Sequence, residues 1–195
     1  MTFAHDVVEP VPGAPILWIT GLSGTGKSTL ARAFTQALRR VGPPPLLLDG
    51  DSLRNALEGD VVDKGAVDHG PAARRQRAWR IARLARLAAE QGVPVVVATI
   101  SLFHEVQAFN RSGAVPYAEV LLRADIDMLA ARHPKLYGEP GQSPPRDVVG
   151  IDIVPEYPRQ PELVITQGFD RASMAGHVAQ LKRLWMQMLQ LEMAR

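Results

Sequence analysis

The sequence predicts an α/β fold in which helices cover a parallel β-sheet. Short apolar runs alternate with helical segments along the chain, which is the pattern of a parallel sheet. One apolar run, residues 16–20, leads into a glycine-rich segment, and a second, residues 46–48, ends in Asp49-Gly50-Asp51. Ligands of such sheets bind at the carboxyl ends of the strands. We therefore expect residues 21–28, 49–51 and 100–103 to surround one crevice.

The glycine-rich segment is a phosphate-binding loop in its spacing and its context. Residues 21–29 read Gly-Leu-Ser-Gly-Thr-Gly-Lys-Ser-Thr and match G-x-x-x-x-G-K-[ST] at each fixed position. Such a loop turns backbone N–H groups toward an anion, and the following helix adds a partial positive charge. Lys27 is expected to reach the β- and γ-phosphates, and Ser28 to hold Mg²⁺. The alternative, a glycine-rich turn without function, is disfavoured by the strand–loop–helix context.

The first half of the chain then divides as follows. Residues 28–40 predict a helix, because apolar side chains recur at helical spacing until Val41-Gly42-Pro43-Pro44-Pro45 ends it. Ser52 is a candidate N-cap for a short helix after the second strand. Residues 58–72 predict a surface loop and residues 73–91 a long helix. Residues 94–99 predict a third strand, apolar on both faces as in a parallel sheet.

The second half repeats the alternation. We expect helices at 105–111 and 125–132, strands at 118–122 and 163–165, and a closing helix at 171–193. Residues 133–160 contain six prolines and three glycines, and an irregular stretch of that length predicts a functional lid. The whole predicts one domain, residues 15–195, around a five-stranded parallel sheet, after a mobile lead-in at residues 1–14.

Composition narrows the class of protein. Hydrophobic residues make up 46% and charged residues 22% of the chain, as in ordinary globular proteins. The absence of cysteine excludes disulfides and cysteine-ligated zinc. A net charge of +2 does not call for nucleic acid, and no apolar run is long enough to span a bilayer. The start lacks the order of a signal peptide. We expect a cytoplasmic protein without a nucleic-acid or membrane partner.

The placement of the acidic residues favours a small-molecule kinase. NTPases of the motor and helicase type carry an acid at the end of a later apolar strand, whereas here that strand ends in Thr99. Phosphoryl transfer needs a group that orients the acceptor hydroxyl. Asp51 is the candidate for this role, and Asp49 is expected to support Mg²⁺ or the acceptor. The alternative is an exposed Asp-Gly-Asp turn, since these residues are common in turns.

Five segments resemble the adenylylsulfate (APS) kinase family and occur in the family's order. They are residues 21–29, Leu48-Asp49-Gly50-Asp51-Ser52-Leu53-Arg54, Ile100-Ser101-Leu102-Phe103, Arg132-His133-Pro134-Lys135-Leu136-Tyr137 and Gly150-Ile151-Asp152. The resemblance spans residues 16–165. It implies a P-loop kinase fold, a homodimer, and the cofactors ATP and Mg²⁺. The implied reaction, part of sulfate assimilation, phosphorylates the ribose 3′-hydroxyl of adenosine 5′-phosphosulfate to give 3′-phosphoadenylylsulfate and ADP.

The resemblance also implies roles for individual residues. Catalysis falls to Asp51, Lys27 and Ser101, the last matching a serine sometimes described as a phosphorylated intermediate. Ser28 and Asp49 would hold the metal. ATP would be bound by Gly21, Leu22, Ser23, Gly24, Thr25, Gly26, Lys27, Ser28, Thr29 and Arg132. The acceptor nucleotide would be bound by Asp49, Arg54, His69, Arg74, Arg77, Ile100, Ser101, Leu102, Phe103, Gly150, Ile151 and Asp152.

Departures from the family pattern concentrate on the acceptor side and leave alternatives open. His69 stands where the family has a stacking phenylalanine, Arg77 where it has asparagine, His133 where it has aspartate, and Arg146 where it has a lysine. The second reading is therefore a kinase of the same fold for another activated nucleotide, such as CDP-phosphoramidate. A third is a catalytically silent nucleotide-binding regulatory module. The intact Lys27 and Asp51 argue against that third reading.

Overall fold

The computed structural model describes residues 13–58, 70–138 and 146–193. Its strands are β1 (Ile16–Thr20), β2 (Leu46–Asp49), β3 (Val95–Ala98), β4 (Tyr117–Arg123) and β5 (Leu163–Thr166). They pair in parallel in the order β2-β3-β1-β4-β5, which confirms the predicted five-stranded parallel sheet. The register aligns Ile16 with Val95 on one side and with Tyr117 on the other.

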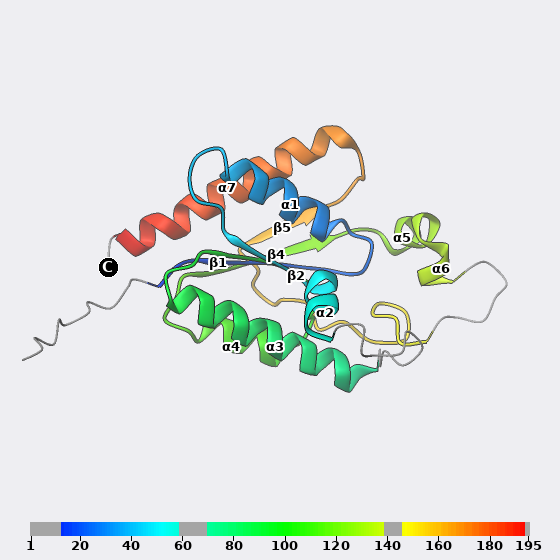
Figure 1. Ribbon diagram of the computed structural model, residues 1–195. Helices are drawn as coiled ribbons and strands as arrows, with labels where there is room; N and C mark the ends of the chain where they lie inside the picture. The colour runs from blue at the N-terminus through cyan, green and yellow to red at the C-terminus, as the bar shows by residue number, and fades with distance from the viewer. Residues whose placement is uncertain (1–12, 59–69, 139–145, 194–195) are drawn as a thin grey trace, which may run out of the picture.

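Helices cover both faces of the sheet (Figure 1). α1 and α7 lie on one face, and α3 and α4 on the other, while α2, α5 and α6 lie beyond the carboxyl ends of the strands. The bounds are α1 (Lys27–Leu38), α2 (Gly50–Glu58), α3 (Pro71–Glu90), α4 (His104–Arg111), α5 (Ile126–Arg132), α6 (Pro134–Tyr137) and α7 (Arg171–Met193). None of the described helices is long and apolar enough to cross a membrane.

Each face of the sheet has its own hydrophobic core, and β1 contributes to both. Leu17 and Ile19 pack toward α1 and α7, where the rings of Phe34 and Trp185 meet edge to face at 5.8 Å. Trp18 points to the opposite face, onto α3 and α4. Alternate side chains of β1 are thus buried on opposite faces, as expected for a central strand of a parallel sheet.

A third apolar cluster lies beyond the carboxyl ends of the strands and bears on the site. It joins residues of the glycine-rich loop, of the segment after β3, of α5 and α6 and of the segment 146–160, namely Leu22, Leu102, Leu129, Tyr137, Val148 and Val149. The Tyr137 hydroxyl also donates a hydrogen bond to the Ser23 carbonyl, at 2.6 Å. These contacts fix α6 against the glycine-rich loop.

Several element boundaries differ from the predicted ones. Ser52 is not an N-cap: α2 already begins at Gly50, and the Asp49 carboxylate accepts the Ser52 N–H at 3.2 Å. α3 begins at Pro71, two residues early, because proline suits the first helical turn. The predicted lid is less irregular than expected, since it contains α6 and a bridge between Val149 and Ile153. Residues 139–145 of it, most of the lead-in and most of the loop 58–72 lie outside the described residues.

Candidate active site

The phosphate-binding loop connects β1 to α1 in a shape that only glycine permits at key positions. Gly24 and Gly26 have φ of +74° and +88°, in the left-handed region. A Cβ atom at Gly21 would overlap the Leu122 carbonyl oxygen. The N-terminus of α1 follows directly at Lys27, so its unpaired N–H groups face the loop. The segment is thus built to bind an anion.

Lys27 is buried within this loop. Its Nζ donates to the Leu22 carbonyl at 2.6 Å, and Thr25 Oγ1 donates to the same oxygen at 2.9 Å. Burial lowers the pKa of Lys27 to about 8, although the charges of Asp51 and Asp49 oppose this shift. Burial thus makes the charged form of Lys27 less favourable than in water, and an anion bound to the loop would favour that charged form.

A cavity of about 640 Å³ opens over the loop, and we call it the phosphate-loop cavity. At its wall the Arg132 guanidinium lies over the Phe169 ring, 4.3 Å from the centroid. The predicted residues that line it are Ser23, Gly24, Gly26, Lys27, Ser28, Thr29 and Arg132. Asp51 and four residues not predicted for this cavity, His133, Gln167, Phe169 and Asp170, complete most of the wall. Gly21, Leu22 and Thr25 do not line it.

Asp49 and Ser28 form an oxygen-rich corner that fits Mg²⁺. Asp49 is 4% exposed, and its Oδ2 has no hydrogen-bond partner among the described residues. Burial raises the pKa of Asp49. Hydrogen bonds from Ser28 and Ser52 and the nearby charge of Arg32 lower it, and together they have the larger effect, so the pKa lies below its usual range. No group of three or more acidic or histidine side chains in the described part of the chain could hold a metal. Mg²⁺ commonly uses one or two carboxylates and takes its other ligands from phosphates and water, and this corner offers that arrangement.

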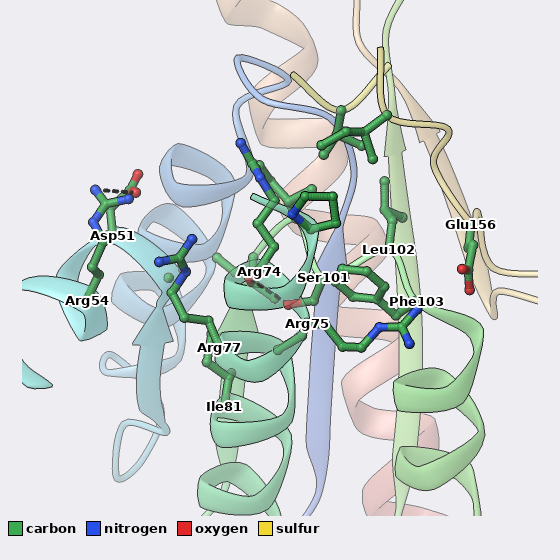
Figure 2. A pocket seen from close by; sticks show the side chains of 18 of the residues that line it. Asp51, Arg54, Arg74, Arg75, Arg77, Ile81, Ser101, Leu102, Phe103 and Glu156 are labelled. Atoms are coloured by element: carbon green, nitrogen blue, oxygen red, sulfur yellow. Dashed lines mark hydrogen bonds and ion pairs between the residues drawn. The ribbon is translucent and has the colours of Figure 1, made fainter. Parts of the chain in front are cut away.

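A second cavity, of about 280 Å³, lies between α2, α3 and the segment that follows β3, and we call it the arginine-lined cavity (Figure 2). α2 contributes Arg54, and α3 contributes Arg74, Arg75 and Arg77. In Figure 2 the side chains of Arg74 and Arg77 extend toward the start of α3, and Arg54 is joined to Asp51 by an ion pair. The opposite wall carries Leu102, Phe103 and Glu156.

The charges in this cavity favour an anionic ligand. Burial lowers the pKa of Arg74, and the neighbouring charges of Arg77 and Arg54 lower it as well, against Asp147 and Asp152. Arg74 also donates from Nη2 to the Asp147 carbonyl. Clustered guanidinium groups repel one another, and an anion with several oxygen acceptors can bind more than one of them at once.

Residues 100–103 form the floor of the arginine-lined cavity. Ser101 is 7% exposed and has a φ of +26°, and its Oγ lies 3.0 Å from Thr99 Oγ1. The Arg75 guanidinium lies over the Phe103 ring, 5.5 Å from the centroid. Ile100 and Leu102 complete this stretch of the lining.

Other predicted acceptor residues are placed differently. Gly150, Ile151 and Asp152 do not line the cavity, whereas their neighbours Val149, Ile153 and Val154 do. The Asp152 carboxylate accepts the N–H groups of Asp147 and Val148, each at 2.6 Å, and so closes the turn that carries those neighbours. His69 lies outside the described residues.

Asp51 and Ser28 line both cavities. The Asp51 side chain is 77% exposed, and its Oδ1 lies 3.0 Å from Arg54 Nη2. A single carboxylate at the first turn of α2 thus stands where a group bound on the loop would meet a molecule in the arginine-lined cavity. Sequence reasoning found this residue because it directly follows a buried strand. It missed Arg75 and Glu156, which no motif singles out.

A phosphate-binding loop at the carboxyl edge of a parallel sheet, a metal-compatible corner and a carboxylate shared with a second cavity define a P-loop kinase. The model of the adenylylsulphate kinase family matches residues 13–166. The chain belongs to this family, as the resemblance in its motifs predicts.

Individual relatives agree with this assignment. The chain is 40% identical over 151 residues to the adenylyl-sulfate kinase of Aeromonas salmonicida, which covers 76% of this chain and 74% of the relative. It is 34% identical over 152 residues to the cytidine diphosphoramidate kinase of Campylobacter jejuni, covering 77% and 84%. An APS kinase of Mycobacterium tuberculosis, solved in complex with AMPPNP and APS, superposes with a TM-score of 0.72 at 26% identity, over 92% of this chain and 99% of that one.

Proposed function

We propose that this protein transfers the γ-phosphate of ATP to the ribose 3′-hydroxyl of adenosine 5′-phosphosulfate, giving 3′-phosphoadenylylsulfate and ADP. The observation that carries the proposal is the position of Asp51, which lines both the phosphate-loop cavity and the arginine-lined cavity. The 40% identity to an adenylyl-sulfate kinase supports APS as the acceptor.

The phosphate-loop cavity would bind ATP. The loop N–H groups and Lys27 would neutralise the phosphates, and Lys27 would exchange its bond to the Leu22 carbonyl for one to phosphate. Ser28 and Asp49 would hold Mg²⁺, which when bound would neutralise charge on the β- and γ-phosphates. The Arg132–Phe169 pair offers a flat surface suited to a base or ribose.

The arginine-lined cavity would bind the acceptor. Arg54, Arg74 and Arg77 would bind the phosphosulfate group, and residues 100–103 with the Val149 turn would enclose the nucleoside. Asp51, oriented by Arg54, would accept the hydrogen bond and then the proton of the 3′-hydroxyl as the oxygen attacks the γ-phosphate. This direct transfer needs no covalent intermediate, so Ser101 would serve as part of the cavity floor.

A cytidine diphosphoramidate acceptor is the second candidate. It is favoured by the 34% identity to a cytidine diphosphoramidate kinase and by Arg77, which adds a guanidinium to the acceptor cavity. In either case we expect a cytoplasmic homodimer, which light scattering and fractionation would test.

The test is an acceptor panel in which ADP formation is followed with APS, cytidine diphosphoramidate, gluconate and shikimate. We expect APS to give the highest kcat/KM and both non-nucleotides to give only the slow background of ATP hydrolysis. The proposal fails if APS does not raise ADP formation above that background. A higher kcat/KM with cytidine diphosphoramidate would establish the second candidate instead.

A further inference from the structure

His133 lies on the phosphate-binding loop although it belongs to a distant part of the chain. It joins α5 to α6, and its backbone is fixed on both sides. The N–H donates to the Leu129 carbonyl at 2.9 Å, and the carbonyl accepts the Leu136 N–H at 2.9 Å. Tyr137, in α6, donates a hydrogen bond to the Ser23 carbonyl, and this bond ties the connection to the phosphate-binding loop. The position of His133 is therefore set by its neighbours.

The imidazole ring contacts the loop at Gly24. A Cβ atom built on Gly24 would lie 2.5 Å from Cδ2 and 2.9 Å from Nε2 of His133, so the ring fits only because residue 24 is glycine. His133 also lines the phosphate-loop cavity together with Lys27 and Ser28. Within the described residues, no hydrogen bond or ion pair engages either ring nitrogen. The ring of this exposed residue therefore lies beside Gly24 of the anion-binding loop, at the wall of the cavity.

The charges around this cavity come from several elements. Lys27 belongs to the start of α1, Asp51 to α2, Arg132 to α5 and Asp170 to the segment before α7. A phosphate chain held by the loop N–H groups would lie between these groups and next to the ring. A neutral imidazole can donate one N–H, and an imidazolium can donate two. Either form can therefore bind a phosphate oxygen.

We propose that His133 is a nucleotide-binding residue that donates a ring N–H to the β- or γ-phosphate of the bound nucleotide. This inference deepens the proposed function and rests on one half of it, the binding of ATP in the phosphate-loop cavity. It does not depend on which acceptor is used. It assigns a role on the ATP side to the α5–α6 connection, in addition to that of Arg132.

The test is calorimetric binding of ADP and ATP, without acceptor, to the full chain and to His133→Ala, His133→Gln and His133→Asp. Loss of one hydrogen bond to a charged group should weaken binding at least about tenfold in His133→Ala. His133→Gln should recover most of the affinity, because its amide can donate to phosphate. His133→Asp places the family's residue here, and because it removes the donor and adds a negative charge beside the phosphates it should bind more weakly than the unmodified chain.

Lys135→Ala is the matched control, because Lys135 is a cation of the same connection that does not line the cavity. It should bind ADP and ATP like the unmodified chain, and all variants should show the same thermal unfolding midpoint. Unchanged affinity in His133→Ala and His133→Asp would overturn the inference. So would a His133→Gln variant as weak as His133→Ala, which would point to packing on Gly24 instead of donation. Failure of the proposed acceptor would appear only in the acceptor panel and would leave this binding result intact.

Discussion

At the scale of single residues, Asp51 connects the two cavities, and its charge is the property that matters. Asp51→Asn keeps the shape but removes the carboxylate that is proposed to accept the proton. We expect kcat to fall at least about a hundredfold, while the Kd for ADP changes less than about twofold, because the loop itself is untouched. Steady-state kinetics and calorimetry would measure the two effects.

Asp127→Asn provides the matched control for this substitution. Asp127 lies in α5, is exposed and lines neither cavity, so its variant should keep full activity. An Asp51→Asn variant with normal turnover, or one whose loss lies wholly in ADP affinity, would rule out the role of Asp51 as the base.

The burial of Lys27 makes a prediction about pH. Its pKa in the free protein is lowered to about 8, and only the charged form binds phosphate well. Above pH 8 the bound lysine must first take up a proton, so the Kd for ADP should rise by up to about tenfold per pH unit. Below pH 8 this contribution should be flat. Calorimetry between about pH 6 and pH 9 without metal would measure it; an equally steep rise in Lys27→Ala would contradict it.

At the scale of elements, β4 carries a buried acid that the proposed reaction does not use. Glu119 is 1% exposed, and its Oε2 lies 3.2 Å from Arg111 Nη2. Burial raises the pKa of Glu119, and the charge of Arg111 only partly offsets this shift. The folded state therefore holds this proton more tightly than the unfolded state does, so the contribution of Glu119 to stability decreases as pH rises above about 4.5.

Glu119→Gln removes this titration while keeping the shape. We expect the free energy of unfolding of the variant, relative to the unmodified chain, to increase as pH rises above about 4.5 and to level off above the raised pKa of Glu119. Urea unfolding at several pH values would measure this difference. Glu90→Gln, an exposed change in α3, should show no such trend. A pH-independent difference for Glu119→Gln would show that Arg111 fully compensates the buried charge.

Local pattern predicted the elements because each strand is mostly apolar, with Glu119 of β4 as an exception inside a strand, and each long helix has an apolar side. It did not predict how they assemble. The order β2-β3-β1-β4-β5 depends on pairing between residues distant in sequence, such as Ile16 with Val95. Ser52 was wrong as a cap because α2 already begins at Gly50, and the end of the preceding strand brings the Asp49 carboxylate to the Ser52 N–H.

The candidate site was predictable where one short motif supplies it and not where tertiary contacts do. The loop and Asp51 follow buried strands directly, so their place at the sheet edge follows from the sequence. Glu156 reaches the arginine-lined cavity only because its backbone N–H bonds the Leu102 carbonyl and its carboxylate accepts the His104 N–H at 2.6 Å. Nothing in the local sequence encodes those contacts.

At the scale of the whole molecule, the division between a nucleotide side and an acceptor side predicts separable effects. Arg77 lines the arginine-lined cavity and does not line the phosphate-loop cavity. Arg77→Asn should raise the KM for APS about tenfold, as expected for one lost ionic hydrogen bond, and leave the Kd for ADP unchanged. Arg80→Asn, one turn further along α3 and outside the cavity, is the control.

An Arg80→Asn effect as large as that of Arg77→Asn would mean that general surface charge, not the cavity, attracts the acceptor. An unchanged KM for APS in Arg77→Asn would remove Arg77 from the acceptor site. A lower KM for cytidine diphosphoramidate than for APS in the unmodified chain, lost in Arg77→Asn, would identify Arg77 as the reason for that preference.

In the proposed reaction, Asp51 directs the 3′-hydroxyl of APS onto the γ-phosphate. The most direct measurement compares APS with its 3′-deoxy analogue and reads the phosphorylated position by phosphorus NMR. We predict one ADP for each APS, with the new phosphate on the 3′-oxygen, and only background ATP hydrolysis with the analogue. Equal ADP formation from both compounds, or a phosphate on any other atom of APS, would contradict the account.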